Sequence, residues 1–170
     1  MNKVESVISL RPIEYRDIDD LNEWKNNKEV FKYLGGGFSP TSIDCQKKWM
    51  DKFIDLSGNN RRFIIEYNKH SVGLIGLYNI NWIHRTSELG IYIGNQSFQG
   101  KGIGNNACEL IEEYAKNYLN LRKIKLFVVD ENHRAKKMYK KLGYKEVGKL
   151  IDERFIDGKY YSLIIMEKFL

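Results

Sequence analysis

A glycine-rich stretch in the middle of the chain has the composition of an anion-binding turn. Residues 99–104 read Gln-Gly-Lys-Gly-Ile-Gly, between an apolar run, Leu89 to Ile93, and a helical pattern from Asn105 to Leu119. The first amide groups of a helix have no partner within it, and the helix dipole is positive there. Glycine lets the backbone approach a phosphate closely, and Lys101 adds a positive charge. The stretch therefore predicts a pyrophosphate site, with a plain strand-to-helix turn as the alternative.

Other chemical motifs are missing from the sequence. The Gly-Lys-Ser/Thr ending of a P-loop is absent, and the glycine spacing differs from that of a dinucleotide-binding turn. Cys45 and Cys108 are far apart and show no metal-ligand spacing, so we expect no metal site and a reduced protein without disulfides. Neither cysteine has an evident histidine partner, which argues against a covalent acyl-cysteine intermediate.

Length and composition favour one globular domain over residues 1–170, because 170 residues of which 42% are hydrophobic can bury a full core. No run is long enough to span a membrane, and the N-terminal residues lack the apolar core of a signal peptide. We therefore expect a cytoplasmic protein without a membrane partner. The net charge of +6 suits an anionic ligand, whereas the scattered lysines argue against nucleic acid.

The glycine turn must be positioned by the elements around it. Periodicity and turn residues predict strands at 6–14, 62–67, 72–80, 88–94, 123–129, 144–155 and 159–170. Helices are expected at 17–26, 28–34, 105–119 and 133–142, and from a cap at Thr41 or Ser42 to Asp55, with Ile43, Trp49, Met50 and Phe53 inward.

The order of these elements predicts an α/β fold with a mixed sheet and helices on both faces. The early strands follow one another directly and predict an antiparallel meander, whereas the later strands alternate with helices and predict some parallel pairing. Ligands in such sheets favour the crevice at the C-terminal ends of diverging strands. The strands that end at Gly94 and Val129 are expected to meet there.

Two blocks of the sequence resemble the signatures of GNAT-type, acetyl-CoA-dependent N-acetyltransferases. Gln99-x-x-Gly102-x-Gly104 after a strand is similar to their Q/R-x-x-G-x-G/A motif. Asn132-x-x-Ala135-x-x-x-Tyr139, followed by Lys141-Leu142-Gly143-Tyr144, resembles the block that follows the fifth strand of these enzymes. The resemblance covers nearly the whole chain and is closest to the group of spermidine/spermine and ribosomal-protein N-terminal acetyltransferases. It implies the GNAT acyltransferase fold and N-acetylation of a primary amine by direct attack in a ternary complex.

The resemblance also implies how acetyl-CoA is held. The pyrophosphate is expected on the amides of Phe98, Gln99, Gly100, Lys101, Gly102, Ile103 and Gly104. The backbone of Ile91, Tyr92 and Ile93 is expected to pair with the pantetheine arm like an added strand, with Gly94 permitting a bulge. Asn132 is expected to bond the pantetheine or to cap its helix, with Ala135 nearby. For Arg134, Lys136 and Lys137 we favour a solvated helix face over contact with the ribose phosphate.

Proton transfer needs two further groups. In the resembled family the tyrosine at the position of Tyr139 protonates the departing coenzyme A thiolate, and it lies on the same helix face as Asn132. An alkyl ammonium has a pKa near ~10.4, so a base must take a proton from the acceptor. Glu88, at the start of the strand beside the acetyl site, is the first candidate for this base. His84 in the preceding loop is the second.

The identity of the acceptor is left open by the sequence. A small amine, a polyamine, an amino sugar or a protein N-terminus all fit the resemblance. Polyamine enzymes of the group carry an acidic cluster after the second helix, where this chain has Gly35-Gly36-Gly37-Phe38-Ser39. The positive net charge also disfavours a polycation. A non-catalytic acyl-CoA-binding or regulatory module is the alternative function, and relatives leave a homodimer or higher oligomer open.

Overall fold

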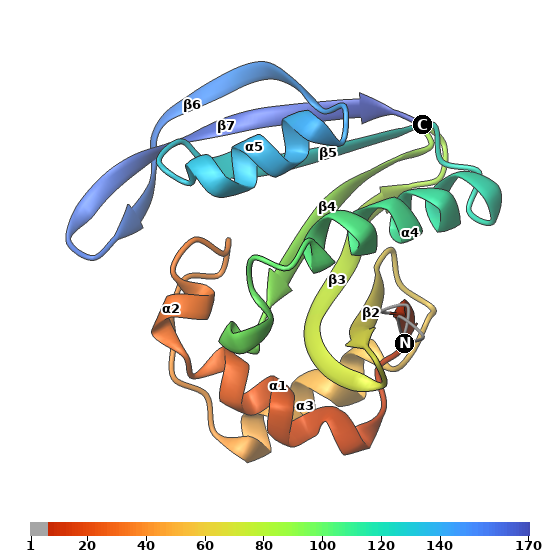
Figure 1. Cartoon of the computed structure of the whole chain (residues 1–170), viewed down its shortest axis with the longest axis vertical. Coiled ribbons are helices and arrows are strands. Elements are labelled where there is room, and N and C mark those ends of the chain that lie inside the picture. The colour runs from red at the N-terminus through yellow and green to blue at the C-terminus, as the bar shows by residue number, and fades with distance from the viewer. Residues whose placement is uncertain (1–6) are drawn as a thin grey trace, which may run out of the picture.

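Seven strands form the frame of the structure, a computed structural model that describes residues 7–170 (Figure 1). They make one sheet in the order β1-β2-β3-β4-β5-β7-β6. The neighbours β1 to β4 are antiparallel, β4 and β5 are parallel, and β7 is antiparallel to both β5 and β6. The bounds are β1 Ile8–Pro12, β2 Arg61–Tyr67, β3 His70–Asn81, β4 Thr86–Ile93, β5 Lys123–Val129, β6 Lys145–Ile156 and β7 Lys159–Phe169. The predicted meander and the predicted parallel pair are both confirmed.

Helices cover both faces of the sheet, as predicted. They are α1 Ile18–Lys25, α2 Lys28–Phe31, α3 Ile43–Phe53, α4 Ile103–Asn117 and α5 His133–Lys141, with short 3-10 turns at Tyr15–Asp17 and Gln96–Phe98. One apolar cluster joins α4 and α5 to Ile65, Ile75 and Leu126 of the sheet. A second cluster joins α1, α2 and α3 to Ile64 and Leu74 on the opposite face. Burial on both faces explains why the central strands read as nearly continuous apolar runs.

Several boundaries differ from the predictions. The first predicted strand starts at Ser6, which lies outside the described residues. Helix α4 begins at Ile103, so Ile103 and Gly104 form its first turn and do not belong to the loop. Ser42, and not Thr41, caps α3, since its side chain accepts from the amide of Cys45 at 3.2 Å. Ile43 was wrongly predicted to point inward: it is 45% exposed, whereas Met50 is fully buried.

The final hairpin follows the prediction closely. Asp157 and Gly158 have φ values of 49° and 81°, as a type I′ turn between two antiparallel strands requires. The hairpin extends the sheet beyond β5 and leaves β6 as an edge strand. It thereby brings the turn around Asp157 close to α2, where Lys28 forms an ion pair with Asp157 at 2.8 Å.

Candidate active site

The parallel strands β4 and β5 separate after three residue pairs. Thr86, Ser87 and Glu88 pair with Lys123, Ile124 and Lys125, and no later pair joins the two strands. Beyond this point β4 continues alongside β3 and β5 continues alongside β7. Figure 1 shows the two strands diverging from the side of the molecule where the C-terminus lies. The edge of residues 89–93 that faces β5 therefore has no strand partner and can pair with an extended ligand.

A cavity of about 650 Å³ adjoins this unpaired edge. It combines the end of β4, the glycine turn, the start of α4, one side of α5 and part of the α2 region. The predicted residues that line it are Ile91, Tyr92, Ile93, Phe98, Gln99, Gly100, Gly102, Ile103, Gly104, Asn132, Ala135 and Tyr139. Two predicted residues, Lys101 and Glu88, are not in the lining.

The glycine turn opens α4 in the way that the sequence predicts. Gly100 and Gly102 have φ values of 81° and 76°, which few other residues adopt, and Gly102 is the N-cap of α4. The amides of Phe98 and Gln99 already donate to Asn95 and Gln96 carbonyls, each at 3.1 Å. The expectation that these two amides bind pyrophosphate is therefore corrected. The donors that remain start at Gly100 and include the first turn of the helix.

The positive charge at this turn comes mainly from α5. Lys101 is exposed, and its ammonium lies 5.0 Å from the centre of the Phe98 ring, outside the cavity lining. Arg134 lies at the turn instead, with Nη2 3.7 Å from the position of a Cβ atom on Gly100. Arg134 and Lys137 both line the cavity while their side chains are exposed, so the solvated helix face and a contact with a ligand phosphate both fit their positions.

Side chains on β4 alternate between the two faces of the sheet. Ile91 and Ile93 pack into the cluster of α4 and α5, whereas Tyr92 packs against Trp24 and Phe31 on the other face. Burial raises the pKa of Tyr92, followed by a smaller effect of Tyr78. These side chains fix the strand, so a ligand on its free edge meets main-chain groups.

Two side chains organise the ends of the diverging strands. Gln99 donates from Nε2 to the carbonyl oxygen of Ile93 at 3.2 Å, which ties the glycine turn to the end of β4. Asn132 caps α5 by accepting from the amide of Ala135 at 3.2 Å through Oδ1. The capping role that the sequence left open is thus observed. The cap uses only Oδ1, so the Nδ2 group of Asn132 can donate to a ligand.

Asp130, two residues before this cap, is anchored by two lysines. Asp130 accepts from Lys136 at 2.6 Å and from Lys149 at 2.7 Å. These hydrogen bonds lower the pKa of Asp130 to about 2. The ion pair with Asp130 holds the Lys136 side chain outside the cavity lining, whereas Arg134 and Lys137 line the cavity.

Tyr139 is a buried phenol at the wall of the cavity. It is 7% exposed, and its ring meets that of Tyr144 edge-on at 5.7 Å. Burial raises the pKa of Tyr139, with a smaller contribution from Cys108. The phenol is consequently protonated throughout the neutral range and available as a proton donor. Cys108 itself is a buried core thiol, and burial raises its pKa.

Glu88 lies at the point where β4 and β5 part. It is half-buried, pairs with Tyr78 of β3 as well as with Lys125, and belongs to the face of Tyr92. Burial raises the pKa of Tyr78 and lowers the pKa of Arg154, and the charge of Glu88 makes a smaller upward contribution to both. The structure therefore places it on the α1–α3 side of the sheet, whereas Tyr139 belongs to the α5 side.

His84 occupies a different part of the molecule. It is exposed in the turn that precedes β4, at the strand end opposite to Ile91–Ile93. It does not line the cavity beside β4. This position removes the geometric reason to consider it as a base. Among residues 7–170, no group of three histidine, cysteine, aspartate or glutamate side chains is arranged to hold a metal ion, and no helix could span a membrane.

Comparison with known proteins identifies the same arrangement in a family of enzymes. Residues 8–145 match the family model of the GNAT acetyltransferase domain. A spermidine N(1)-acetyltransferase of Escherichia coli K12 is 35% identical over 94% of this chain and 84% of its own length. A Bacillus subtilis protein named for ribosomal N-acetylation is 27% identical over 95% of this chain and 91% of its own.

A solved structure extends the comparison to three dimensions. The spermidine N-acetyltransferase of Vibrio cholerae, in complex with CoA and spermine, superimposes with a TM-score of 0.89 at 32% identity, covering 95% of each chain. The predicted fold, enzyme class and acetyl-CoA co-substrate are confirmed by these matches. The chain belongs to the GNAT family and is an acetyl-CoA-dependent N-acetyltransferase.

Proposed function

We propose that the protein transfers the acetyl group of acetyl-CoA to a primary amine of a small molecule by direct attack in a ternary complex. The observation that carries the proposal is the unpaired edge of β4, which faces a cavity shared with the glycine turn and Tyr139. An extended thioester arm on this edge would lead from the anion-binding turn towards the phenol of Tyr139. We assign the whole chain, residues 1–170, to this one domain.

The residues of the cavity divide the binding of acetyl-CoA between them. The amides from Gly100 to Gly104 and the guanidinium of Arg134 hold the pyrophosphate, because unpaired helix donors and a cation converge at that turn. Main-chain groups of Ile91 to Ile93 pair with the pantetheine arm, which the Nδ2 group of Asn132 can also bond. A backbone N–H of the same edge can stabilise the oxyanion that develops on the thioester carbonyl.

Two side chains move the protons. Glu88 acts as the base that takes a proton from the acceptor ammonium, directly or through water, since an amine with a pKa near ~10.4 is almost fully charged at neutral pH. Tyr139 then donates its proton to the departing thiolate. Glu88 and Tyr139 lie on opposite faces of the sheet. The gap between β4 and β5 connects these two faces, and therefore the base and the acid.

The names of two relatives indicate which class of acceptor to assay first. Two of the proteins described above are named for spermidine acetylation, so polyamines are the first class to assay. A cytoplasmic location stays part of the proposal, and fractionation of expressing cells tests it.

We also propose that the protein associates with a second copy through the β6 edge. Val147, Ile151 and Phe155 on this strand are 52%, 69% and 61% exposed, and an edge strand with exposed apolar side chains favours pairing with another chain. Light scattering during size exclusion should give a mass above that of one chain, and Ile151→Glu should lower it. A wild-type mass of one 20.0 kDa chain would contradict the association.

Calorimetric titration with acetyl-CoA, followed by thiol release across an amine panel, tests the main proposal. The panel contains spermidine, amino sugars with and without phosphate, and peptides that begin with alanine or serine. Binding of acetyl-CoA with amine-dependent thiol release supports the transferase. Binding without release on any amine would instead favour a non-catalytic acyl-CoA-binding module.

A further inference from the structure

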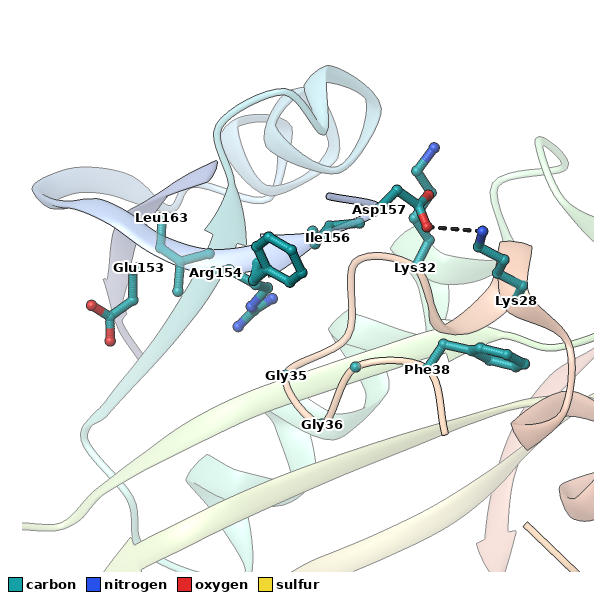
Figure 2. Close-up of a pocket in the computed structure, with 12 residues that line it drawn as sticks. Lys28, Lys32, Gly35, Gly36, Phe38, Glu153, Arg154, Ile156, Asp157 and Leu163 are labelled. Atoms are coloured by element: carbon teal, nitrogen blue, oxygen red, sulfur yellow. Dashed lines mark ion pairs between the residues drawn. The ribbon is translucent and has the colours of Figure 1, made fainter. Parts of the chain in front are cut away.

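A second cavity, of about 720 Å³, lies between the α2 region and the final hairpin. Its walls come from Lys28 and Lys32, from the loop 35–38, and from residues 153–157 of the hairpin (Figure 2). This is the place at which the sequence departs from the polyamine enzymes that it resembles, since three glycines stand there without a carboxylate. The cavity has the size of a site for a small-molecule ligand.

Arg154 is the central charged group of this cavity. Its Nη1 donates to the carbonyl oxygen of Tyr33 at 2.7 Å, and Nη2 is 3.7 Å from the position of a Cβ atom on Gly35. Burial lowers the pKa of Arg154, while the charges of Glu153 and Glu88 act in the opposite direction. Among residues 7–170, no carboxylate forms an ion pair with its guanidinium. A half-buried guanidinium is thus held by a neutral carbonyl group alone.

The three other half-buried arginines among the described residues differ from Arg154 in their partners. Arg61 donates to the carbonyl oxygens of Gly58 and Asn60, both at 2.8 Å, and its guanidinium also lies 5.7 Å from the centre of the Trp82 ring. Arg11 bonds the carboxylates of both Asp17 and Glu66, the latter at 2.6 Å, and is therefore neutralised within the fold. Arg62 has no carboxylate partner, but its guanidinium lies 3.5 Å from the centre of the Phe53 ring and near two further aromatic rings, which compensate the charge. Arg154 has neither kind of partner, although the charges of Glu153 and Glu88 act on it. Its guanidinium forms no ion pair among the described residues and is available to an anion that enters the cavity.

The remaining charges around the cavity add to this positive charge. Asp157 pairs with Lys28, and Lys32 acts on the same carboxylate, so two lysines share one acid. In Figure 2 the guanidinium of Arg154 points towards the loop of Gly35 and Gly36, whereas the carboxylate of Glu153 points away from it. The loop opposite Arg154 leaves room for a ligand, because a Cβ atom on Gly36 would meet nothing within 4 Å.

Arg154 also links this cavity to the reaction centre. Its guanidinium is close enough to Glu88, the proposed base, for their charges to interact. Tyr33, whose carbonyl holds Arg154, lines the acetyl-CoA cavity together with Leu34. The α2 region thus forms a wall common to both cavities. An acceptor with its amine at Glu88 can extend from there to Arg154.

We propose that Arg154, supported by Lys32, binds a phosphate group of the acceptor, and that the substrate is a primary amine that carries phosphate or diphosphate. The proposal rests on the transferase function above and specifies its acceptor. A planar guanidinium binds phosphate oxygens through paired, charge-assisted hydrogen bonds. A polycation would meet a guanidinium without an ion-pair partner at the same position.

Matched acceptors test the proposal through kcat/KM from thiol release. Glucosamine 6-phosphate and glucosamine differ only in phosphate, and spermidine serves as the phosphate-free polycation. We expect kcat/KM for glucosamine 6-phosphate to exceed that for glucosamine about tenfold or more. This ratio corresponds to the contribution of one charge-assisted hydrogen bond. Arg154→Gln should abolish this preference by raising the KM for glucosamine 6-phosphate. The distant, exposed Arg16→Gln is the control that should retain the preference.

A second pair of variants separates the effect of a negative charge at position 36 from the effect of side-chain size. Gly36→Glu and Gly36→Gln place side chains of equal size in open space, and Gly36 does not have the positive φ of Gly37. The glutamate variant alone should lose the phosphate preference and gain on spermidine. Equal behaviour of the two variants, or an unchanged preference in Arg154→Gln, would overturn the proposal. So would a wild-type enzyme that prefers spermidine.

A binding measurement distinguishes failure of this proposal from failure of the transferase function. With the glycine turn saturated by CoA, inorganic phosphate is titrated into wild-type protein and into Arg154→Gln. If no amine releases thiol but Arg154-dependent phosphate binding persists, the transferase assignment fails and the anion site stands. If thiol is released without any phosphate preference, the acceptor proposal fails, even where phosphate binds.

Discussion

The indole ring of Trp24 lies against the backbone of Gly94, at the end of β4. A Cβ atom on Gly94 would be 2.1 Å from Cδ2 of Trp24, closer than such contacts occur in proteins. Gly94 has no positive φ, and its amide donates to the carbonyl oxygen of Val72 at 2.9 Å. The amide of Asn95 donates to the same carbonyl oxygen at 3.2 Å, so two successive residues share one partner on β3, which is the hydrogen-bond pattern of a bulge. A second register shift between β3 and β4 lies at Tyr78–Asn81, and Gly94 is required by the close approach of α1.

Replacing Gly94 by alanine should disturb both stability and cofactor binding. The added methyl group must displace Trp24 or the end of β4, at a cost of about 1–3 kcal/mol in the free energy of unfolding. The same displacement should weaken acetyl-CoA binding, because Ile91 to Ile93 lead directly into Gly94. Urea unfolding and calorimetric titration measure the two effects. Gly58→Ala is the control, since its Cβ atom would meet nothing within 4 Å.

Loss of the Tyr139 hydroxyl should slow turnover without weakening acetyl-CoA binding. Removal of a general acid typically lowers kcat by ~100-fold or more, and the ring of Tyr139→Phe retains its packing. Tyr144→Phe is the matched control: its hydroxyl is buried without a hydrogen-bond partner among the described residues and is not part of the cavity lining. Equal kcat values for Tyr139→Phe and wild type would remove this residue from the mechanism.

Glu88→Gln should give a defect that depends on pH. The variant lacks the proposed base, so its rate should follow the fraction of acceptor amine that is already deprotonated. That fraction grows as the pH approaches the amine pKa near ~10.4, and the ratio of wild-type to variant kcat should therefore shrink from pH 7 to pH 9.5. His84→Gln should match wild type at every pH. A ratio that does not change with pH would exclude Glu88 as the base.

Buried tyrosines should make the fold sensitive to alkali. Burial raises the pKa of Tyr92, Tyr139 and Tyr144 above the ordinary value near ~10. Above pH ~10 the unfolded chain loses these protons while the folded chain keeps them, so the free energy of unfolding falls as the pH rises. The urea midpoint should decline from pH 9 to pH 11, and less steeply in Tyr144→Phe. Identical slopes in variant and wild type would contradict this account of Tyr144.

Local features of the site were predictable from the residues themselves. The glycines at 100 and 102 require backbone angles that other residues avoid, and Asn132 caps the helix that it precedes, because both properties depend on a few neighbouring atoms. The alternation of strands and helices likewise predicted that part of the sheet is parallel. The two motifs then led to acetyl-CoA, since each matched a known family at the expected separation.

Other features depended on contacts between distant segments. Arg134, and not Lys101, lies at the glycine turn because α5 packs beside α4, which no spacing within either segment reveals. The sequence predicts Gly94 as a strand end that permits a bulge, and only the fold shows Trp24 packed against its backbone. Arg154 is 121 residues from Tyr33, the residue whose carbonyl it bonds.

The sequence by itself determined the secondary structure, the anion-binding turn and the class of reaction, because these follow from local geometry and from motifs that are contiguous in the chain. Only the tertiary structure decided where β4 and β5 separate, which cations reach each cavity, and that Glu88 and Tyr139 lie on different faces of the sheet. The physical reason is that burial, charge compensation and steric fit at these sites are set by side chains from segments far apart in the chain.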